Sequence, residues 1–90
     1  MNANEITIEL FGTARHRAGM AQVVVRGDTL IDALRQLQAA CPTLEGLVQA
    51  DGALSPHYLL SLDGQRFLGS LGEPLPDGAR VLLLSADAGG

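Results

Sequence analysis

The chain has 90 residues, of which 47% are hydrophobic, and it carries a formal net charge of −4. This length predicts one domain with a modest core, and the hydrophobic content is too high for a disordered segment. The acidic balance disfavours a protein that binds duplex nucleic acid or an anionic membrane surface. Because Cys41 is the one cysteine, an internal disulfide is impossible, and we expect a cytoplasmic protein.

Two strands are predicted near the start of the chain. Polar and apolar residues alternate over 5–11, which is the period of a half-buried strand. Residues 12–19 are interpreted as a polar connection. The β-branched segment 22–26 predicts a second strand, paired antiparallel with the first.

The next segment carries helix signals. Thr29, with Asp32 three residues later, matches a capping box in its acidic variant. The helix then has an apolar stripe at i, i+4, i+7 and i+11, formed by Leu30, Leu34, Leu37 and Cys41. Pro42 ends it. The place of Cys41 on this stripe favours a buried small hydrophobe over a nucleophile.

The third strand is predicted over 58–62, after an ambiguous segment, 43–52, that allows a short second helix. The pair Asp63-Gly64 is typical of a hairpin turn and predicts a short returning strand over 65–68.

The last strand is predicted over 80–85, after a loop over 69–78. Its continuous apolar run indicates a central strand that is covered on both faces. One helix across one face of a four- or five-stranded sheet gives two layers and one core. We therefore expect a single α+β domain over 1–90, with 84–90 as a flexible C-terminal tail.

No catalytic constellation is apparent in the sequence. His16 and His57 lie far apart and lack a cluster of Cys, His and carboxylate residues, so we expect no bound metal. His16 stands between Arg15 and Arg17, in what is either a solvated turn or a loop that recognises an anion. The serines match no nucleophile elbow, and the glycines match neither a phosphate loop nor a dinucleotide fingerprint. We expect that the domain is not an enzyme by itself.

The chain ends in small residues, Ser85-Ala86-Asp87-Ala88-Gly89-Gly90. Six extended residues reach at most about 20 Å, which is long enough to enter an active site on another protein. Glycine suits this task because it has no Cβ and lets the backbone approach a partner closely. The carboxylate of Gly90 is then the group to be activated. Taken alone, such an end is also typical of a frayed terminus.

The chain resembles the MoaD/ThiS family of ubiquitin-like sulfur carriers over nearly its whole length. Three motifs carry the resemblance: Phe11-x-x-x-Arg15-x-x-x-Gly19, Gly27-Asp28-Thr29-Leu30 and Pro74-Leu75-x-Asp77-Gly78-x-x-Val81. The first is similar to the first loop of the molybdopterin synthase small subunit. The third is followed, as in the family, by an apolar strand and a short tail to the Gly-Gly end.

The resemblance implies a β-grasp fold, in which the last strand is central and parallel to the first. It also implies a mechanism. An ATP-dependent, ubiquitin-activating-like adenylyltransferase adenylates Gly90, and a sulfurtransferase or persulfide donor converts it to a thiocarboxylate. A partner enzyme then takes the sulfur. The carrier itself binds no permanent cofactor, since the activating enzyme uses the ATP.

The resemblance further implies which residues bind partners. In the tail they are Gly89, Ala88, Asp87 and Ala86. On the sheet, exposed apolar residues including Phe11 and Phe67 are expected to dock a partner. The alternative is that Phe11 and Phe67 belong to the core. Neither nucleic acid nor a membrane is expected among the partners.

The pathway that the resemblance favours is molybdenum cofactor biosynthesis, with this chain as the small subunit of molybdopterin synthase and the large subunit as its partner. Alternative carriers feed cysteine, thiamine or other sulfur-metabolite biosynthesis. A different class is the ubiquitin-like protein modifier, joined through Gly90 to a lysine of another protein. A third interpretation is a β-grasp interaction domain with a fortuitous Gly-Gly end.

Overall fold

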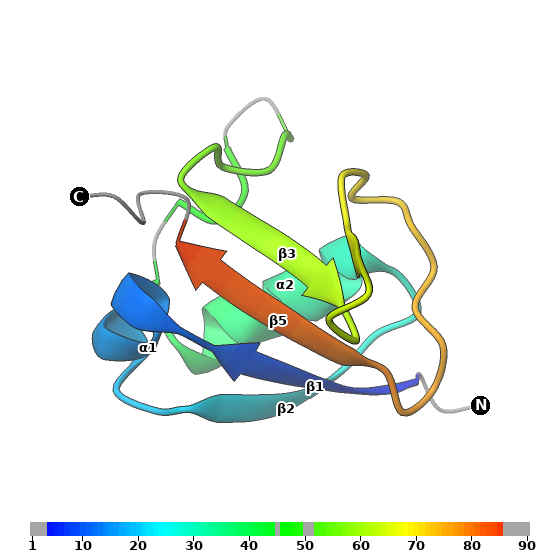
Figure 1. Ribbon diagram of the computed structural model, residues 1–90, viewed down its shortest axis with the longest axis horizontal. Coiled ribbons are helices and arrows are strands. Elements are labelled where there is room, and N and C mark those ends of the chain that lie inside the picture. The colour runs from blue at the N-terminus through cyan, green and yellow to red at the C-terminus, as the bar shows by residue number, and fades with distance from the viewer. Residues whose placement is uncertain (1–3, 45, 50–51, 86–90) are drawn as a thin grey trace.

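A computed structural model describes residues 4–44, 46–49 and 52–85 (Figure 1). The strands of this part are β1 (Glu5–Leu10), β2 (Gln22–Arg26), β3 (Tyr58–Leu62), β4 (Arg66–Phe67) and β5 (Arg80–Ser85), and its helices are α1 (Gly12–Ala18) and α2 (Leu30–Ala40). The strands form one mixed sheet in the order β2-β1-β5-β3-β4, and α2 lies across one face (Figure 1). The expected α+β, β-grasp architecture is confirmed.

The central strand of the sheet is β5. It pairs parallel with β1 and antiparallel with β3, as expected for the last strand. Parallel strands finish at the same end of a sheet. For this reason α1, which follows β1, lies beside Ser85, the last described residue of the chain. We call this end of the molecule the exit end.

The core lies between α2 and the sheet face that it covers. Strand residues alternate between this face and the other one, so every second side chain enters the core. The fully buried side chains of this layer include Ile6, Ile8, Leu10, Leu30, Leu34, Leu37, Val81 and Leu83. Burying one such side chain stabilises a fold by about 1.5–3 kcal/mol. The predicted stripe of α2 is confirmed, and Cys41 at its end is 2% exposed.

The start of α2 is fixed by a cap and by a close approach. The Thr29 hydroxyl accepts a hydrogen bond from the Asp32 backbone N–H at 3.4 Å and donates one to the Asp32 carboxylate at 3.0 Å. The predicted capping residue is thus confirmed. Just before it, Gly27 touches the helix so closely that a Cβ there would lie 2.8 Å from Asp32 Cβ and 2.9 Å from the Ala33 backbone nitrogen.

The predicted hairpin turn between β3 and β4 is also confirmed. Asp63 and Gly64 have φ angles of 54° and 73°, and the Gln65 N–H donates to the Leu62 carbonyl at 2.9 Å. Positive φ at both central residues is the signature of a type I′ turn. The returning strand, β4, is two residues long and therefore shorter than predicted.

Residues 12–19 were interpreted from the sequence as a polar connection, but most of them build the helix α1. This helix buries only Ala14, so its sequence has no apolar stripe from which a helical period can be read. Its end is set by Gly19, which adopts φ 74° and donates its N–H to the Arg15 carbonyl at 2.9 Å. A left-handed glycine is a common end for a helix.

The described residues of 43–52 form turns, not the helix that the sequence left open. Leu44 and Leu47 are buried all the same, and Val48 forms an isolated bridge with Leu54.

The prediction that β5 is covered on both faces is wrong for one face. Val81 and Leu83 are buried beneath α2, whereas Leu82 and Leu84 point to the other face and are only partly buried. A run of leucines hides this alternation, since both faces carry the same type of residue.

Candidate functional site

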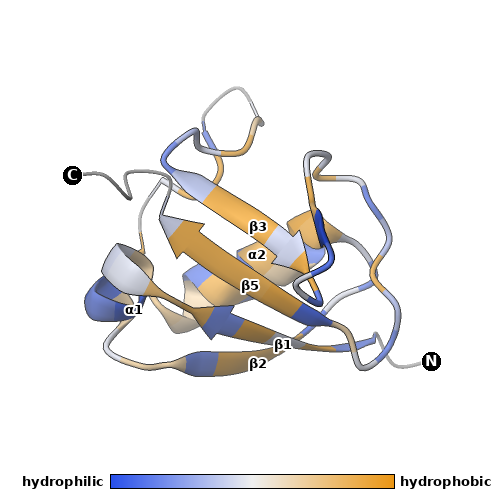
Figure 2. Ribbon diagram, in the orientation of Figure 1, coloured by the Kyte–Doolittle hydropathy of each residue, from blue (hydrophilic) through white to orange (hydrophobic). Residues whose placement is uncertain are grey.

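The sheet face opposite α2 carries an apolar patch. Figure 2 shows that most residues of β3 and β5 are hydrophobic, and these strands lie on the side of the sheet away from α2 in this view. The register aligns Leu59, which is 43% exposed, with Leu84. One row further, Leu82, Ser61 and Phe67 follow one another across β5, β3 and β4. Aligned residues share a face of the sheet. Leu59, Leu82, Leu84 and Phe67 therefore lie on this face, with the buried Ser61 between Leu82 and Phe67.

Phe11 and Phe67 stand on opposite sides of this surface. The Phe11 N–H donates to the Leu83 carbonyl at 3.0 Å, which continues the pairing of β1 and places Phe11 beside Leu84. Phe11 is 38% exposed and Phe67 is 68% exposed, so neither is a core residue. From β1 to β4 the surface spans three strand spacings, about 14 Å. We call it the open-face patch; its residues are Phe11, Leu59, Phe67, Leu82 and Leu84.

The residues predicted to carry sulfur and to enter a partner lie outside the described residues; they are Ala86, Asp87, Ala88, Gly89 and Gly90. Their point of attachment is described. Ser85 ends β5 next to Leu84 of the open-face patch, and a Cβ on Gly12 would lie 4.0 Å from Ser85 Cβ. A tail on Ser85 therefore begins between the patch and α1.

A pocket of about 240 Å³ adjoins the end of β5. Its lining residues are Thr13, Arg17, Gly46, Ser55, His57, Tyr58 and Ser85. The Arg17 guanidinium donates to the Tyr58 hydroxyl at 3.1 Å, and the His57 backbone N–H donates to the Ser55 hydroxyl at 3.2 Å. Sequence reasoning missed this pocket, because its walls come from α1 and from the irregular segment before β3, which are distant in the chain.

The family motif at the end of the chain has a structural role. The Asp77 carboxylate accepts from the Glu5 N–H at 2.7 Å, and the Gly78 N–H donates to the Glu5 carbonyl at 2.8 Å. The Leu75 N–H donates to the Asp28 carbonyl at 2.9 Å. The motif thus ties the start of β5 to the starts of β1 and α2, and it places the two parallel strands in register.

The motif near the start of the chain frames α1. The Arg15 N–H donates to the Phe11 carbonyl at 3.4 Å, and the Gly19 N–H donates to the Arg15 carbonyl at 2.9 Å. A spacing of four residues is one helical turn. Phe11, Arg15 and Gly19 are therefore the cap, the middle and the end of one short helix.

The described ranges offer little catalytic chemistry of their own. Within them, no three residues of the types His, Cys, Asp and Glu gather as a metal site needs. Cys41 is buried, and His16 is exposed on α1. None of the helices described is long and apolar enough to cross a membrane.

A mixed five-stranded sheet with its main helix across one face defines the class of ubiquitin-like β-grasp proteins. The structure is similar to SAMP1 from Haloferax volcanii at 32% sequence identity and a TM-score of 0.82, over 97% of this chain and 100% of that one. SAMP1 stands for small archaeal modifier protein 1. The chain belongs to the MoaD/ThiS family of ubiquitin-like sulfur carriers.

More distant structures share the fold. One is a chain of the BexX/CysO complex from Amycolatopsis orientalis, at 18% identity and a TM-score of 0.79, over 94% of this chain and 99% of that one. Another is described as molybdopterin converting factor, subunit 1, from Pyrococcus furiosus, at 16% identity and a TM-score of 0.72, over 92% and 98%. No protein-family model and no curated protein matches the chain.

Proposed function

We propose that this chain carries sulfur as a thiocarboxylate on Gly90. A carboxylate is a poor electrophile because its charge is delocalised over two oxygens. Adenylation by a ubiquitin-activating-like enzyme with ATP releases pyrophosphate and makes AMP the leaving group. A persulfide from the sulfur donor displaces AMP, and a thiol then reduces the resulting acyl disulfide to the thiocarboxylate.

The thiocarboxylate sulfur is anionic and nucleophilic at neutral pH, so a partner enzyme can transfer it to a precursor. In this division of labour the partners supply the catalytic groups. The chain supplies a docking surface and an arm. The five residues after Ser85 reach about 17 Å when extended, far enough to enter a partner's active site.

The observation that carries the proposal is the open-face patch next to the origin of the tail. Exposed apolar surface of this kind is typical of a protein interaction site. Phe67 is 68% exposed on an edge strand, and Leu59 is 43% exposed at the centre. Because Ser85 follows Leu84 of the patch, a partner that covers this face also lies within reach of a tail attached to Ser85. Membership in the MoaD/ThiS family supports the same arrangement.

Among the possible pathways, we propose molybdenum cofactor biosynthesis, with this chain as the small subunit of molybdopterin synthase. What supports this pathway is the motif that frames α1, Phe11-x-x-x-Arg15-x-x-x-Gly19, which is similar to the first loop of that subunit. The large subunit is then the partner on the open-face patch. Carriers for cysteine, thiamine or other sulfur metabolites use the same chemistry on Gly90 and differ in the accepting enzyme.

A second candidate is a ubiquitin-like protein modifier, which the 32% identity to SAMP1 favours. Activation is the same, but the acceptor is the amine of a lysine on another protein. All six basic residues of this chain are arginines. A second copy therefore finds no lysine on the first, and a modifier of this sequence is added to its targets as single units.

The experiment compares the chain ending at Gly90 with a variant that lacks Gly90, each incubated with ATP and the activating enzyme of the same host. We expect an acyl-adenylate on the full chain and at most a trace on the variant, although both end in a glycine carboxylate. Addition of the sulfur donor then gives a thiocarboxylate. Lysine conjugates ending in Gly90, recovered from the host, indicate the modifier. Equal activation of both chains, or of neither, contradicts the proposal.

A further inference from the structure

In the part of the chain that the structure describes, the exit end is basic, although the protein as a whole is acidic. The last turn of α1 presents Arg15, His16 and Arg17, and all three are exposed. The chain has no Asp or Glu between Glu9 and Asp28, so α1 carries no carboxylate of its own. We call these three residues the α1 basic cluster.

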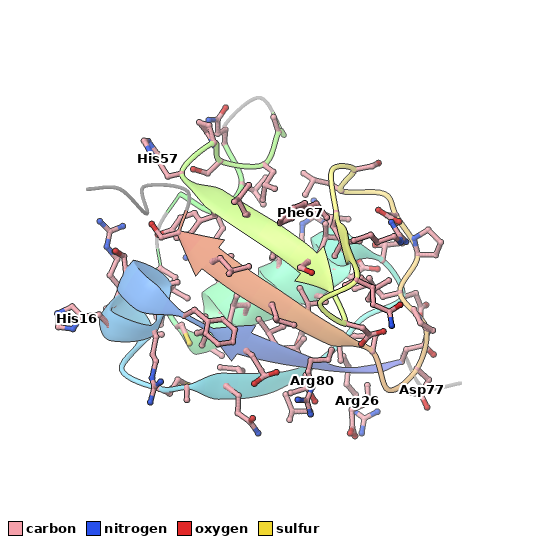
Figure 3. All side chains as sticks on the ribbon, viewed as in Figure 1. His16, Arg26, His57, Phe67, Asp77 and Arg80 are labelled. Atoms are coloured by element: carbon pink, nitrogen blue, oxygen red, sulfur yellow. The ribbon has the colours of Figure 1, made fainter. Side chains whose placement is uncertain are left out.

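The carboxylates of the described residues gather mostly at the other end, where β1, β5 and α2 begin. The Asp28 carboxylate accepts from the Asn4 N–H at 3.3 Å, and the Asp63 carboxylate accepts from the Arg80 N–H at 3.0 Å. In Figure 3, His16 lies on the opposite side of the molecule from Asp77. The acidic residues near this far end are Glu5, Asp28, Asp32, Asp63, Glu73 and Asp77.

Arginines outside α1 are largely matched by carboxylates, and those of α1 are not. The ion pairs are Arg26–Glu5 at 3.5 Å, Arg80–Glu9 at 3.1 Å and Arg66–Glu73. Within residues 4–44, 46–49 and 52–85, Arg15 and Arg17 have no carboxylate partner. The Arg17 guanidinium donates to a neutral group, the Tyr58 hydroxyl. Among the described residues, therefore, no carboxylate compensates the positive charge on α1.

The α1 basic cluster also borders an open groove of about 530 Å³, which Arg15, His16 and Met20 help to line. Met20 is 42% exposed. The groove thus places charged side chains beside an exposed apolar one.

The place of the cluster determines what it faces. Ser85 lies beside the start of α1, and an extended tail of five residues is about 17 Å long. A partner that draws Gly90 into its active site must bring the surface around the entrance to within this distance of Ser85. Because α1 begins beside Ser85, it is one of the surfaces that such a partner approaches.

We infer that the α1 basic cluster docks on an acidic rim around the active-site entrance of the activating enzyme. The inference rests on the proposed function, because it needs a partner that receives the tail. It goes beyond that function by stating the sign of the charge on the partner's surface. The activating enzyme is chosen because carrier and modifier both depend on it. Opposite charge on the two surfaces accelerates association and orients the encounter.

The test measures kcat/KM for acyl-adenylate formation with the host's activating enzyme at low and at high salt. Arg15→Glu is expected to lower kcat/KM about tenfold at low salt. Arg15→Lys keeps the charge and is expected to stay within about twofold of the unmodified chain. The matched control is Arg35→Glu, an equal change of net charge on α2, in a groove beside Arg26 and Asp32; it is expected to stay within about twofold as well.

Salt separates charge from packing. The screening length falls from about 8 Å at physiological ionic strength to about 3 Å at 1 M, so the effect of Arg15→Glu is expected to vanish at 1 M salt. Equal values for Arg15→Glu and Arg35→Glu at low salt, or a loss that persists at 1 M, overturns the inference while the proposed function stands. Failure of the unmodified chain to form an adenylate overturns the proposed function, and the inference falls with it.

Discussion

Leu83 and Leu84 are neighbours on β5, yet they have different surroundings. Leu83 packs beneath α2 and is 0% exposed, whereas Leu84 lies on the other face of the same strand and is partly buried. The same contrast runs across the sheet: the covered face is closed by α2, and the open face ends in the side chains of Leu59 and Phe67, which solvent reaches.

The difference shows that, in a chain of this size, one face of the sheet stabilises the fold and the other is available to bind a partner. A two-layer domain of 90 residues closes one core. The second face of a central strand then stays open, and apolar residues on it add little to folding. They retain their apolar surface for a partner, whose binding buries it. The following predictions test this division, from the largest expected effect to the smallest.

The sharpest comparison is Leu83→Ala against Leu84→Ala. Leu83→Ala leaves a cavity in a closed core and is expected to lower the free energy of unfolding by about 2–5 kcal/mol. Leu84→Ala removes a side chain that is already partly in water, so a loss of about 1 kcal/mol or less is expected. Denaturant unfolding measures both. Equal losses would show that the two faces do not differ in packing.

Gly27→Ala tests how closely β2 and α2 approach each other on the covered side. The new Cβ would lie 2.8 Å from Asp32 Cβ and 2.9 Å from the backbone of Ala33, so the helix must shift. We expect a loss of about 1–3 kcal/mol in the free energy of unfolding. Gly69→Ala is the control, because nothing lies within 4 Å of a Cβ at that position. A variant at Gly27 as stable as this control would contradict the close approach.

Phe67→Ala tests the open-face patch as a docking surface. The free energy of unfolding is expected to change by no more than about 0.5 kcal/mol, since the side chain is 68% exposed. The affinity for the sulfur-accepting enzyme is expected to fall about tenfold, or about 1.4 kcal/mol. Titration calorimetry measures the affinity, and Gln65→Ala on the same hairpin is the control. Unchanged affinity would remove Phe67 from the interface.

Thr29→Ala tests the cap that positions α2 on the covered face. Loss of the hydroxyl leaves the Asp32 N–H without its acceptor and is expected to lower the free energy of unfolding by about 1 kcal/mol. Thr29→Ser keeps the hydroxyl and is expected to remain close to the native value. Thermal unfolding of the three chains measures these differences. Equal stability of Thr29→Ala and the native chain would show that the hydroxyl does not cap α2.

Elements with one exposed and one buried side were predictable from the sequence. β1 alternates, α2 has a stripe and a cap, and the Asp63-Gly64 turn has one preferred geometry. Each of these signals is local, and each is confirmed. The parallel placement of β5 beside β1 came from the family resemblance, since no local pattern specifies which distant strand a strand will join.

Features that depend on tertiary context were missed. α1 buries a single alanine, so it lacks the periodicity that identifies a helix. The exposure of Leu82 and Leu84 depends on how many layers cover the sheet, which a run of leucines does not reveal. Phe11 and Phe67 were recognised as candidates for docking, but their partners in the patch were identified only from the strand register.

The central claim is that Gly90 carries sulfur, and the intact mass of the chain tests it most directly. The chain is purified from its own host with a native C-terminus, under non-reducing conditions. The account predicts a fraction whose mass corresponds to exchange of one oxygen for sulfur, localised to Gly90 by fragmentation. A chain that shows only the plain carboxylate, and that gives no acyl-adenylate with its activating enzyme and ATP, would contradict the account.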